Sequence, residues 1–276
     1  AMVAGDRVHT LIEEGEQRYH DSPTQITQGH ISVSALNFAY QTDKPILHDV
    51  SFDINPGELF AVVGHTGSGK STLLSVLLNF YPTNEGVIRL DGQPLESFSH
   101  DNLRRGIGLI PQEPFIVVGS LRDNIDMGRN LPEAKLLQAA QQAHLTDTIR
   151  QLPDGLDTRL GEGGTRLSTG QRQQLVIARA LAASPQILLL DEATANVDSE
   201  TEQVIQRALR ELHGKVTMII VAHRLSTIKH ADQILVLSHG RIEERGTHNE
   251  LMQTDAGLYR SMYQLQQQAR RVQMLS

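Results

Sequence analysis

A glycine-rich segment, Gly64–Thr72, constrains the fold of this 276-residue chain more than any other part of its sequence. The segment has the sequence GHTGSGKST and lies between the apolar run Leu59–Val63 and the helical-looking stretch Ser71–Phe80. A buried strand that passes through such a loop into a helix is typical of a P-loop, in which backbone N–H groups surround phosphate oxygens. The sequence therefore predicts an α/β fold built around a phosphate site.

Each residue type in this loop suits phosphate binding. The glycines allow the backbone to curl, Lys70 supplies positive charge to the outer phosphates, and the Ser71 hydroxyl is expected to hold Mg²⁺. The alternative, a glycine-rich turn before a helix, is disfavoured by the flanking strand and helix patterns. The expected nucleotide-binding residues of the loop are Gly64, Thr66, Gly67, Ser68, Gly69, Lys70, Ser71 and Thr72.

A second apolar run, Ile187–Leu190, ends in the adjacent acids Asp191 and Glu192. Alone, this pattern is a common strand end, but after a P-loop it falls on the next expected strand of the core sheet. Asp191 could then orient the water shell of the metal, and Glu192 could polarise an attacking water molecule. The two acids predict nucleotide hydrolysis in addition to binding.

The segment Leu167–Gln171, with the sequence LSTGQ, precedes the apolar-periodic stretch Leu175–Leu181. Small hydroxyl-bearing residues at a helix N-terminus can donate hydrogen bonds to a phosphate, although Ser168 or Thr169 could also be an ordinary N-cap. Between a P-loop and an Asp-Glu strand, the segment resembles the ABC transporter ATPase signature. That signature is usually written LSGGQ, so Thr169 replaces its first glycine.

The resemblance covers residues 31 to about 267 and implies roles for further positions. Tyr40 matches the aromatic residue that stacks on adenine, with a core tyrosine as the alternative. Gln112 matches the glutamine that reaches Mg²⁺ and the attacking water, and His223 matches the switch histidine that contacts the terminal phosphate. The implied catalytic residues are Lys70, Gln112, Glu192 and His223, and the implied metal ligands are Ser71, Gln112 and Asp191.

The resemblance also implies that two such domains act as a pair. In the family, each ATP lies between the P-loop of one chain and the signature of the other, so Ser168, Gly170 and Gln171 would bind nucleotide in trans. Asp198 matches a family loop that meets the partner subunit, whereas Asn196 and Val197 depart from that pattern. A monomer is therefore expected to be nearly inactive.

The implied fold is a P-loop NTPase of ABC type, α/β, with a mixed or parallel core sheet, an N-terminal antiparallel β subdomain and an inserted α-helical subdomain. Alternating apolar residues in Ile31–Ile54 independently predict the antiparallel sheet. We expect residues 1–28 to be a linker or helix end from a transmembrane domain, and residues 29–276 to be the ATPase domain. Within it, the expected parts are a RecA-like core at about 29–95 and 186–255, a helical subdomain at about 96–185 and a C-terminal helix at about 256–274.

Composition excludes some functional classes. The net charge is −7 without a Lys/Arg-rich block, so nucleic acid is not an expected partner. There are no cysteines for a disulfide framework, and no apolar run reaches the roughly 20 residues of a spanning helix. At the C-terminal end, an apolar face predicts a helix that docks onto the body in preference to a coiled coil. That face comprises Leu258, Met262, Leu265, Ala269 and Val272.

Finer resemblance favours an exporter. Gly161–Gly164, before the signature, resembles the exporter segment that contacts transmembrane loops, and Arg7–Tyr19 resembles the end of a final transmembrane helix. The stretch Leu167–Glu202 most resembles bacterial multidrug-resistance-like half-transporters of the MdlB kind, which pair with a non-identical partner. The implied place is the cytoplasmic face of the inner membrane, with a homodimeric or, preferably, non-identical second ATPase domain. The substrate, a drug or a lipid among other classes, would be selected by the transmembrane part.

Three alternatives remain open from the sequence. A soluble ABC ATPase acting on ribosomes or DNA usually carries two cassettes or a coiled-coil insertion, which this chain lacks. The separate ATPase subunit of an importer would explain the missing membrane helices, but Glu162 argues against it. A non-hydrolysing regulatory cassette is disfavoured because Glu192 and His223 are both present.

Overall fold

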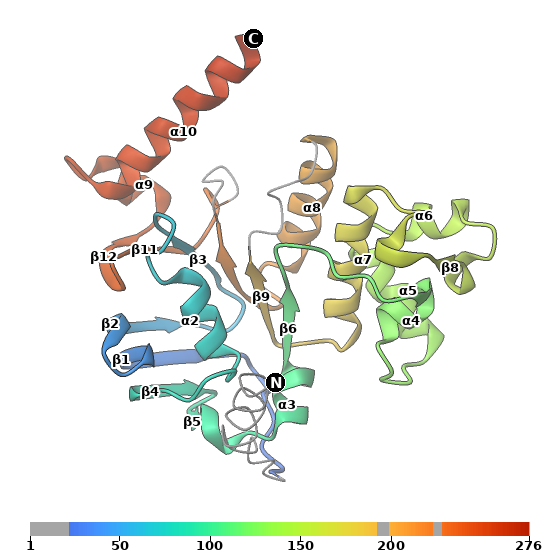
Figure 1. Ribbon diagram of the computed structural model, residues 1–276, viewed down its shortest axis with the longest axis horizontal. Coiled ribbons are helices and arrows are strands. Elements are labelled where there is room, and N and C mark those ends of the chain that lie inside the picture. The colour runs from blue at the N-terminus through green and yellow to red at the C-terminus, as the bar shows by residue number, and fades with distance from the viewer. Residues whose placement is uncertain (1–21, 192–198, 223–227, 276) are drawn as a thin grey trace, which may run out of the picture.

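The structure is a computed structural model and describes residues 22–191, 199–222 and 228–275. A six-stranded core sheet runs through the middle of the molecule, with helices on both sides (Figure 1). Its strand order is β12-β11-β3-β10-β9-β6, and all neighbouring pairs are parallel except β11 with β12. The strands are β3 (Leu59–Val63), β6 (Ile107–Ile110), β9 (Ile187–Asp191), β10 (Thr217–Val221), β11 (Gln233–Ser238) and β12 (Arg241–Gly246).

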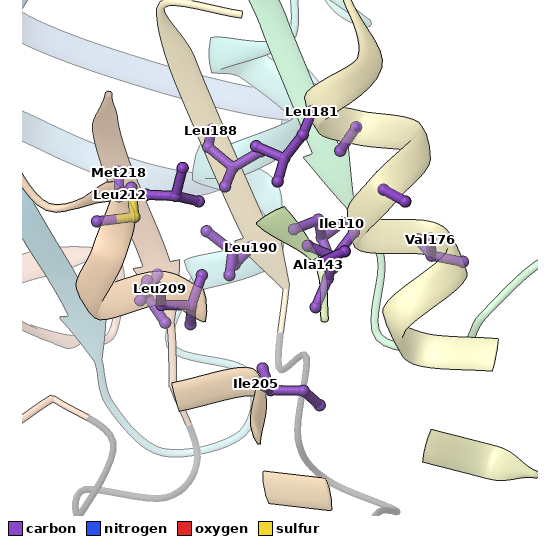
Figure 2. Close-up of a cluster of buried hydrophobic side chains, with 14 of the residues drawn as sticks. Ile110, Ala143, Val176, Leu181, Leu188, Leu190, Ile205, Leu209, Leu212 and Met218 are labelled. Carbon is purple, nitrogen blue, oxygen red and sulfur yellow. The ribbon is translucent and has the colours of Figure 1, made fainter. Parts of the chain in front are cut away.

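The core sheet buries apolar side chains on both faces, which explains why its strands are continuous apolar runs. Side chains alternate along a strand, so Leu188 and Leu190 point to one face and Leu189 points to the other. The first face carries a cluster that includes Leu181 and Leu209 from the covering helices (Figure 2). The second face packs against α2 and the antiparallel sheet.

Nine α-helices are present in the part of the chain that the structure describes. The helices α4 to α7 gather beside β6 and β9, and α8 covers the sheet next to them (Figure 1). Their bounds are α2 (Lys70–Leu77), α3 (His100–Gly106), α4 (Leu121–Asp126), α5 (Glu133–Gln142), α6 (Thr146–Gln151), α7 (Thr169–Ala182), α8 (Ser199–Leu212), α9 (His248–Gln253) and α10 (Leu258–Leu275). Single 3₁₀ turns are η1 (Leu95–Ser97), η2 (Gly155–Asp157) and η3 (Glu162–Gly164).

The predicted N-terminal antiparallel sheet is confirmed. It has the strand order β2-β1-β4-β5, and its apolar face packs in one cluster with α2. In the same cluster Phe52 stacks on Phe60 of β3, with 5.1 Å between ring centroids. The strands are β1 (Ile31–Gln41), β2 (Lys44–Ile54), β4 (Glu85–Leu90) and β5 (Gln93–Pro94). A separate pair joins β7 (Gly119–Ser120) to β8 (Arg159–Leu160).

The stretch 96–185, expected to be helical, also contributes to the core sheet. Its strand β6 pairs in parallel with β9, placing Ile110 beside Leu190. The four residues of β6 are too short for a strand pattern to stand out from the helical periodicity around them. Between Ile110 and β9 the chain contributes no further strand to the core sheet. The division into subdomains stays a prediction.

The C-terminal helix α10 docks through the first part of the predicted face. Leu258 and Met262 pack against the main cluster, but Leu265 is 63% exposed, and the helix projects away from the body (Figure 1). The deepest anchor is Tyr259, which is fully buried and whose hydroxyl forms a 2.8 Å hydrogen bond with Nδ1 of His248. Glu244 accepts hydrogen bonds from the first backbone N–H groups of α10. Among the described residues, no helix has the length and apolarity that a bilayer span requires.

Candidate nucleotide site

Four neighbouring parallel strands bring the predicted site residues to one edge of the core sheet. The register pairs Val221 with both Val62 and Asp191, and pairs Ile110 with Leu190. The carboxyl ends of β3, β10, β9 and β6 therefore lie side by side, spanning roughly 14 Å at the usual strand spacing. Ligands of open α/β sheets bind outside such carboxyl ends.

The P-loop follows β3 at this edge, and two of its glycines have backbone angles and close contacts that a side chain would disturb. Gly64 has φ +155°, and a Cβ there would lie 2.2 Å from the carbonyl oxygen of Leu237 on β11. Gly69 has φ +104° and is the N-cap of α2, where a Cβ would lie 2.8 Å from a methyl group of Leu47. The loop backbone thus packs closely against β11 and β2. Such close packing of glycine backbone is typical of a phosphate-binding loop.

The first turn of α2 has the features of an anion site. Its N-cap provides no side-chain hydrogen bond to the backbone N–H groups, and its first turn contains no acid. Lys70 is buried, and its Nζ donates to the carbonyl oxygens of Gly64 and His65, both at 2.9 Å. Within the described residues, the buried Ser68 hydroxyl has no hydrogen-bond partner. These donors fit a bound polyphosphate.

The remaining predicted loop residues divide into exposed and buried positions. Thr66, Gly67 and Ser71 are exposed at the sheet edge, whereas Thr72 is buried at the start of α2. The exposed Ser71 hydroxyl lies one residue beyond Lys70, so a cation held beside the phosphates could reach it.

The described metal-ligand candidates meet at the same edge although they are far apart in sequence. Asp191 ends β9, and exposed Gln112 follows β6, the strand next to it. Three other predicted residues, Glu192, His223 and Asp198, lie outside the described residues. Asp191, which precedes Glu192, ends β9, and Ala222, which precedes His223, follows the adjacent strand β10.

Tyr40, the predicted adenine platform, is the last residue but one of β1 on the antiparallel sheet. Its side chain is 48% exposed, so the alternative of a core tyrosine is excluded. Its ring makes an edge contact with Phe38 at 4.9 Å and with Tyr81 at 4.9 Å between centroids. A half-exposed aromatic ring held by other rings is suited to stacking on a base.

The signature segment forms the N-terminus of α7 and caps it. The Ser168 hydroxyl accepts a hydrogen bond from Gln171 N at 3.2 Å, and Gln171 Oε1 accepts one from Ser168 N at 2.9 Å. Gly170 is buried in the first turn. The N-cap alternative therefore describes the local geometry of this chain correctly, and phosphate binding in trans stays a prediction.

Sequence reasoning missed Arg172, which joins the signature to the preceding loop. Its guanidinium donates to the Gly163 carbonyl at 3.2 Å and to the Thr169 hydroxyl at 3.1 Å. Thr169, where the family pattern has glycine, thus uses its extra hydroxyl in this contact. The only sequence signal was an arginine directly after the signature, and nothing in the sequence indicated that it reaches Gly163.

Comparison with known proteins decides the family. The family model described as ABC transporter matches residues 47–195, which is more than half of the chain. The chain belongs to the ABC transporter family. It is 42% identical over 267 residues to the multidrug resistance-like ATP-binding protein MdlB of Buchnera aphidicola, covering 96% of this chain and 46% of that protein.

Other exporters of this family are similar over comparable lengths. The ATP-dependent lipid A-core flippase of Legionella pneumophila is 46% identical over 241 residues, covering 87% of this chain and 41% of the flippase. A solved bacterial Atm1-family ABC exporter with ATP bound superposes with a TM-score of 0.84 at 37% identity, covering 96% of this chain and 47% of the exporter. The predicted ABC fold and an ATP-binding, ATP-hydrolysing domain of exporter type are confirmed. The chain spans less than half the length of these relatives.

Proposed function

We propose that this chain is the ATP-driven motor of a membrane exporter and that it works as one of two ATPase domains. The observation that carries the proposal is the separation of two phosphate-binding elements within one chain. α2 packs on β2 and β9, whereas α7 packs on α4, α5, α8 and β6, away from the P-loop (Figure 1). A signature that reaches a phosphate must therefore reach the P-loop of another chain.

The predicted site residues have distinct roles in this proposal. Lys70 and the N–H groups of α2 bind the β- and γ-phosphates, while Ser71, Gln112 and Asp191 supply the hydroxyl, amide and carboxylate oxygens that suit Mg²⁺. When bound with ATP, Mg²⁺ would add positive charge beside the transferred phosphoryl group. Glu192 accepts the proton of the attacking water, and His223 contacts the terminal phosphate.

The partner and the location follow from the family. The part of the relatives that this chain does not cover would contain a transmembrane half, and this domain would lie on its cytoplasmic face at the inner membrane. The name of one relative refers to multidrug resistance and that of another to a lipid A-core flippase, so drugs and lipids are both candidate substrates. The dependence of the ATPase rate on protein concentration tests whether the second ATPase domain is identical.

A basic hollow between the core and the helices is a second proposed docking surface for the transmembrane half, at the opposite end of α7 from Gly161–Gly164. It has a volume of about 840 Å³, lies between α3, α5 and α7, and has exposed Met127 at its rim. Burial, and secondarily the charge of Arg129, lowers the pKa of Arg179 to about 10, so Arg179 stays charged near neutral pH. The basic residues that line the hollow are Arg104, Arg105, Arg129, Lys135 and Arg179.

We predict that Met127→Asp weakens binding of the transmembrane half by about 10- to 100-fold, since a buried Met side chain contributes about 1.5–3 kcal/mol. Affinity is measured between this domain and a relative's transmembrane half in nanodiscs. Leu137→Asp on α5 is the matched control, because Leu137 and Met127 are both 43% exposed and Leu137 lines a different hollow. Equal loss of binding in both variants would contradict the proposed surface.

The pair is tested by measuring the ATPase rate against protein concentration. We expect a rate that rises faster than linearly, because each site needs the signature of a second chain. A specific rate that is independent of concentration would contradict the pair. If ATP binds but hydrolysis appears only when a different half-transporter's domain is added, the partner is non-identical.

A further inference from the structure

We infer that Tyr81 is a second aromatic residue of the adenine site, which holds Tyr40 in the orientation that stacks on the base. The inference rests on the proposed function and deepens it, because it concerns how the same site distinguishes a nucleotide from bare phosphate. Tyr81 lies outside the sequence motifs that point to nucleotide binding, and it follows α2 by four residues.

Three aromatic rings form a cluster near the end of β1. Tyr40 lies between Phe38 and Tyr81, with both centroid distances at 4.9 Å and interplanar angles of 89° and 83°. Phe38 and Tyr81 are 6.0 Å apart. Edge-to-face pairs at these distances are favourable, so Tyr40 is held from two directions.

The two neighbours of Tyr40 differ in how they are supported. Phe38 is buried in the core and precedes Tyr40 by two residues on β1, so both rings lie on one side of the strand. Tyr81 is 44% exposed and comes from a separate segment. Tyr81 therefore contacts the Tyr40 ring from outside β1, whereas Phe38 contacts it from within the same strand.

The backbone beside Tyr40 is held by the same segment that carries Tyr81. The Ala39 N–H donates to Oδ1 of Asn84 at 2.7 Å. The residue paired with Ala39 across the sheet is Pro45, in the strand β2. Residues 81–84 thus fix both the ring and the backbone at the end of β1.

The connection through α2 links the two ends of the nucleotide site. α2 begins at Lys70, which would bind phosphate, and its eight residues span about 12 Å before the chain returns to Tyr40 through Tyr81. Phosphate and base are then recognised by the start of α2 and by the segment that follows its C-terminal end. This arrangement gives Tyr81 a role toward the base and none toward the phosphates.

The expected effect is moderate and specific. Without Tyr81, the half-exposed Tyr40 ring gains rotamer freedom that must be lost again when the base stacks. Removing one such aromatic contact should weaken ATP binding about three- to tenfold. Binding of inorganic tripolyphosphate, which has no base, should be unchanged.

The test compares the affinities of ATP and tripolyphosphate for the purified chain by calorimetry. Tyr81→Leu keeps an apolar side chain but removes the ring, and Tyr81→Phe keeps the ring. We expect weaker ATP binding in the first variant, near-normal binding in the second and unchanged tripolyphosphate affinity in both. Phe80→Leu is the control, because Phe80 is a neighbouring aromatic, 55% exposed, whose ring is not among the three in contact.

A double-mutant cycle shows whether Tyr81 acts through Tyr40. In a Tyr40→Leu background, Tyr81→Leu should have no further effect on ATP affinity. Three results would overturn the inference: an equal loss for ATP and tripolyphosphate, unchanged or tighter ATP binding, or an undiminished effect in the Tyr40→Leu background. If the wild-type chain binds neither ligand, the proposed function itself fails, and that outcome is distinct from the other three.

Discussion

Replacing Lys70 with alanine is expected to abolish ATP hydrolysis and to weaken ATP binding. Lys70 is the buried cation of the P-loop, and its Nζ lies 2.9 Å from two loop carbonyl oxygens at the N-terminus of α2. Charge placed where negative charge develops on the phosphoryl oxygens typically contributes 10²- to 10³-fold in rate, so a loss of about this size is expected. The Mg-ATPase rate of the purified chain, at a concentration where it pairs, is the measurement.

Two controls separate this role from damage to the fold. Lys215→Ala removes an exposed lysine next to β10 and should hydrolyse ATP like the wild type. Thermal unfolding of Lys70→Ala in the absence of nucleotide shows whether the loop still folds. A folded Lys70→Ala chain that retains the wild-type rate would mean that the charge on the phosphates comes from elsewhere, and the P-loop assignment would be wrong.

The substitution Glu192→Gln is expected to stop hydrolysis while ATP stays bound. Glu192 directly follows Asp191, the last residue of β9 at the carboxyl edge of the sheet, and glutamine has the same shape but cannot accept the proton of the attacking water. General-base catalysis typically contributes about 10²- to 10⁴-fold, and a loss in this range is expected. Because the ATP is not consumed, the chains should accumulate as a dimer, which size-exclusion chromatography with Mg-ATP detects.

The matched control is Glu113→Gln, which neutralises an exposed carboxylate directly after Gln112. It should hydrolyse ATP normally and remain in the monomer–dimer equilibrium of the wild type. Persistent turnover in Glu192→Gln would remove the general-base role. Loss of activity without ATP retention would instead indicate that Glu192 contributes to binding.

Much of the site could be predicted because its chemistry is local in sequence. The turn at Gly64 and the helix start at Gly69 depend on backbone angles that few other residues adopt, so the P-loop is recognisable from its letters alone. The capping box of Ser168 and Gln171 is likewise closed within four residues. The antiparallel sheet and the buried strand β9 follow from side-chain alternation and from a continuous apolar run.

Contacts between distant segments could not be predicted in this way. The pairing of β6 with β9 brings Gln112 and Asp191, 79 positions apart in the sequence, to the same edge of the sheet, and strand order is decided by packing on both faces of the sheet. Periodicity predicts which side of α10 is apolar. It does not predict how far along the helix the contact with the rest of the domain extends. Tyr259 anchors the helix because its hydroxyl hydrogen-bonds with His248 and its backbone N–H donates to Glu244.

The amino-acid sequence by itself thus determined the ABC fold, the P-loop, the Asp-Glu strand end and the signature, since each is a short pattern with its own local physics. Only the tertiary structure decided which side chains meet. It placed Tyr81 against Tyr40, joined Arg172 to Gly163, and packed α7, which carries the signature, on α4, α5, α8 and β6. Those contacts depend on the packing of a whole sheet between two layers, to which every segment contributes and which no single segment encodes.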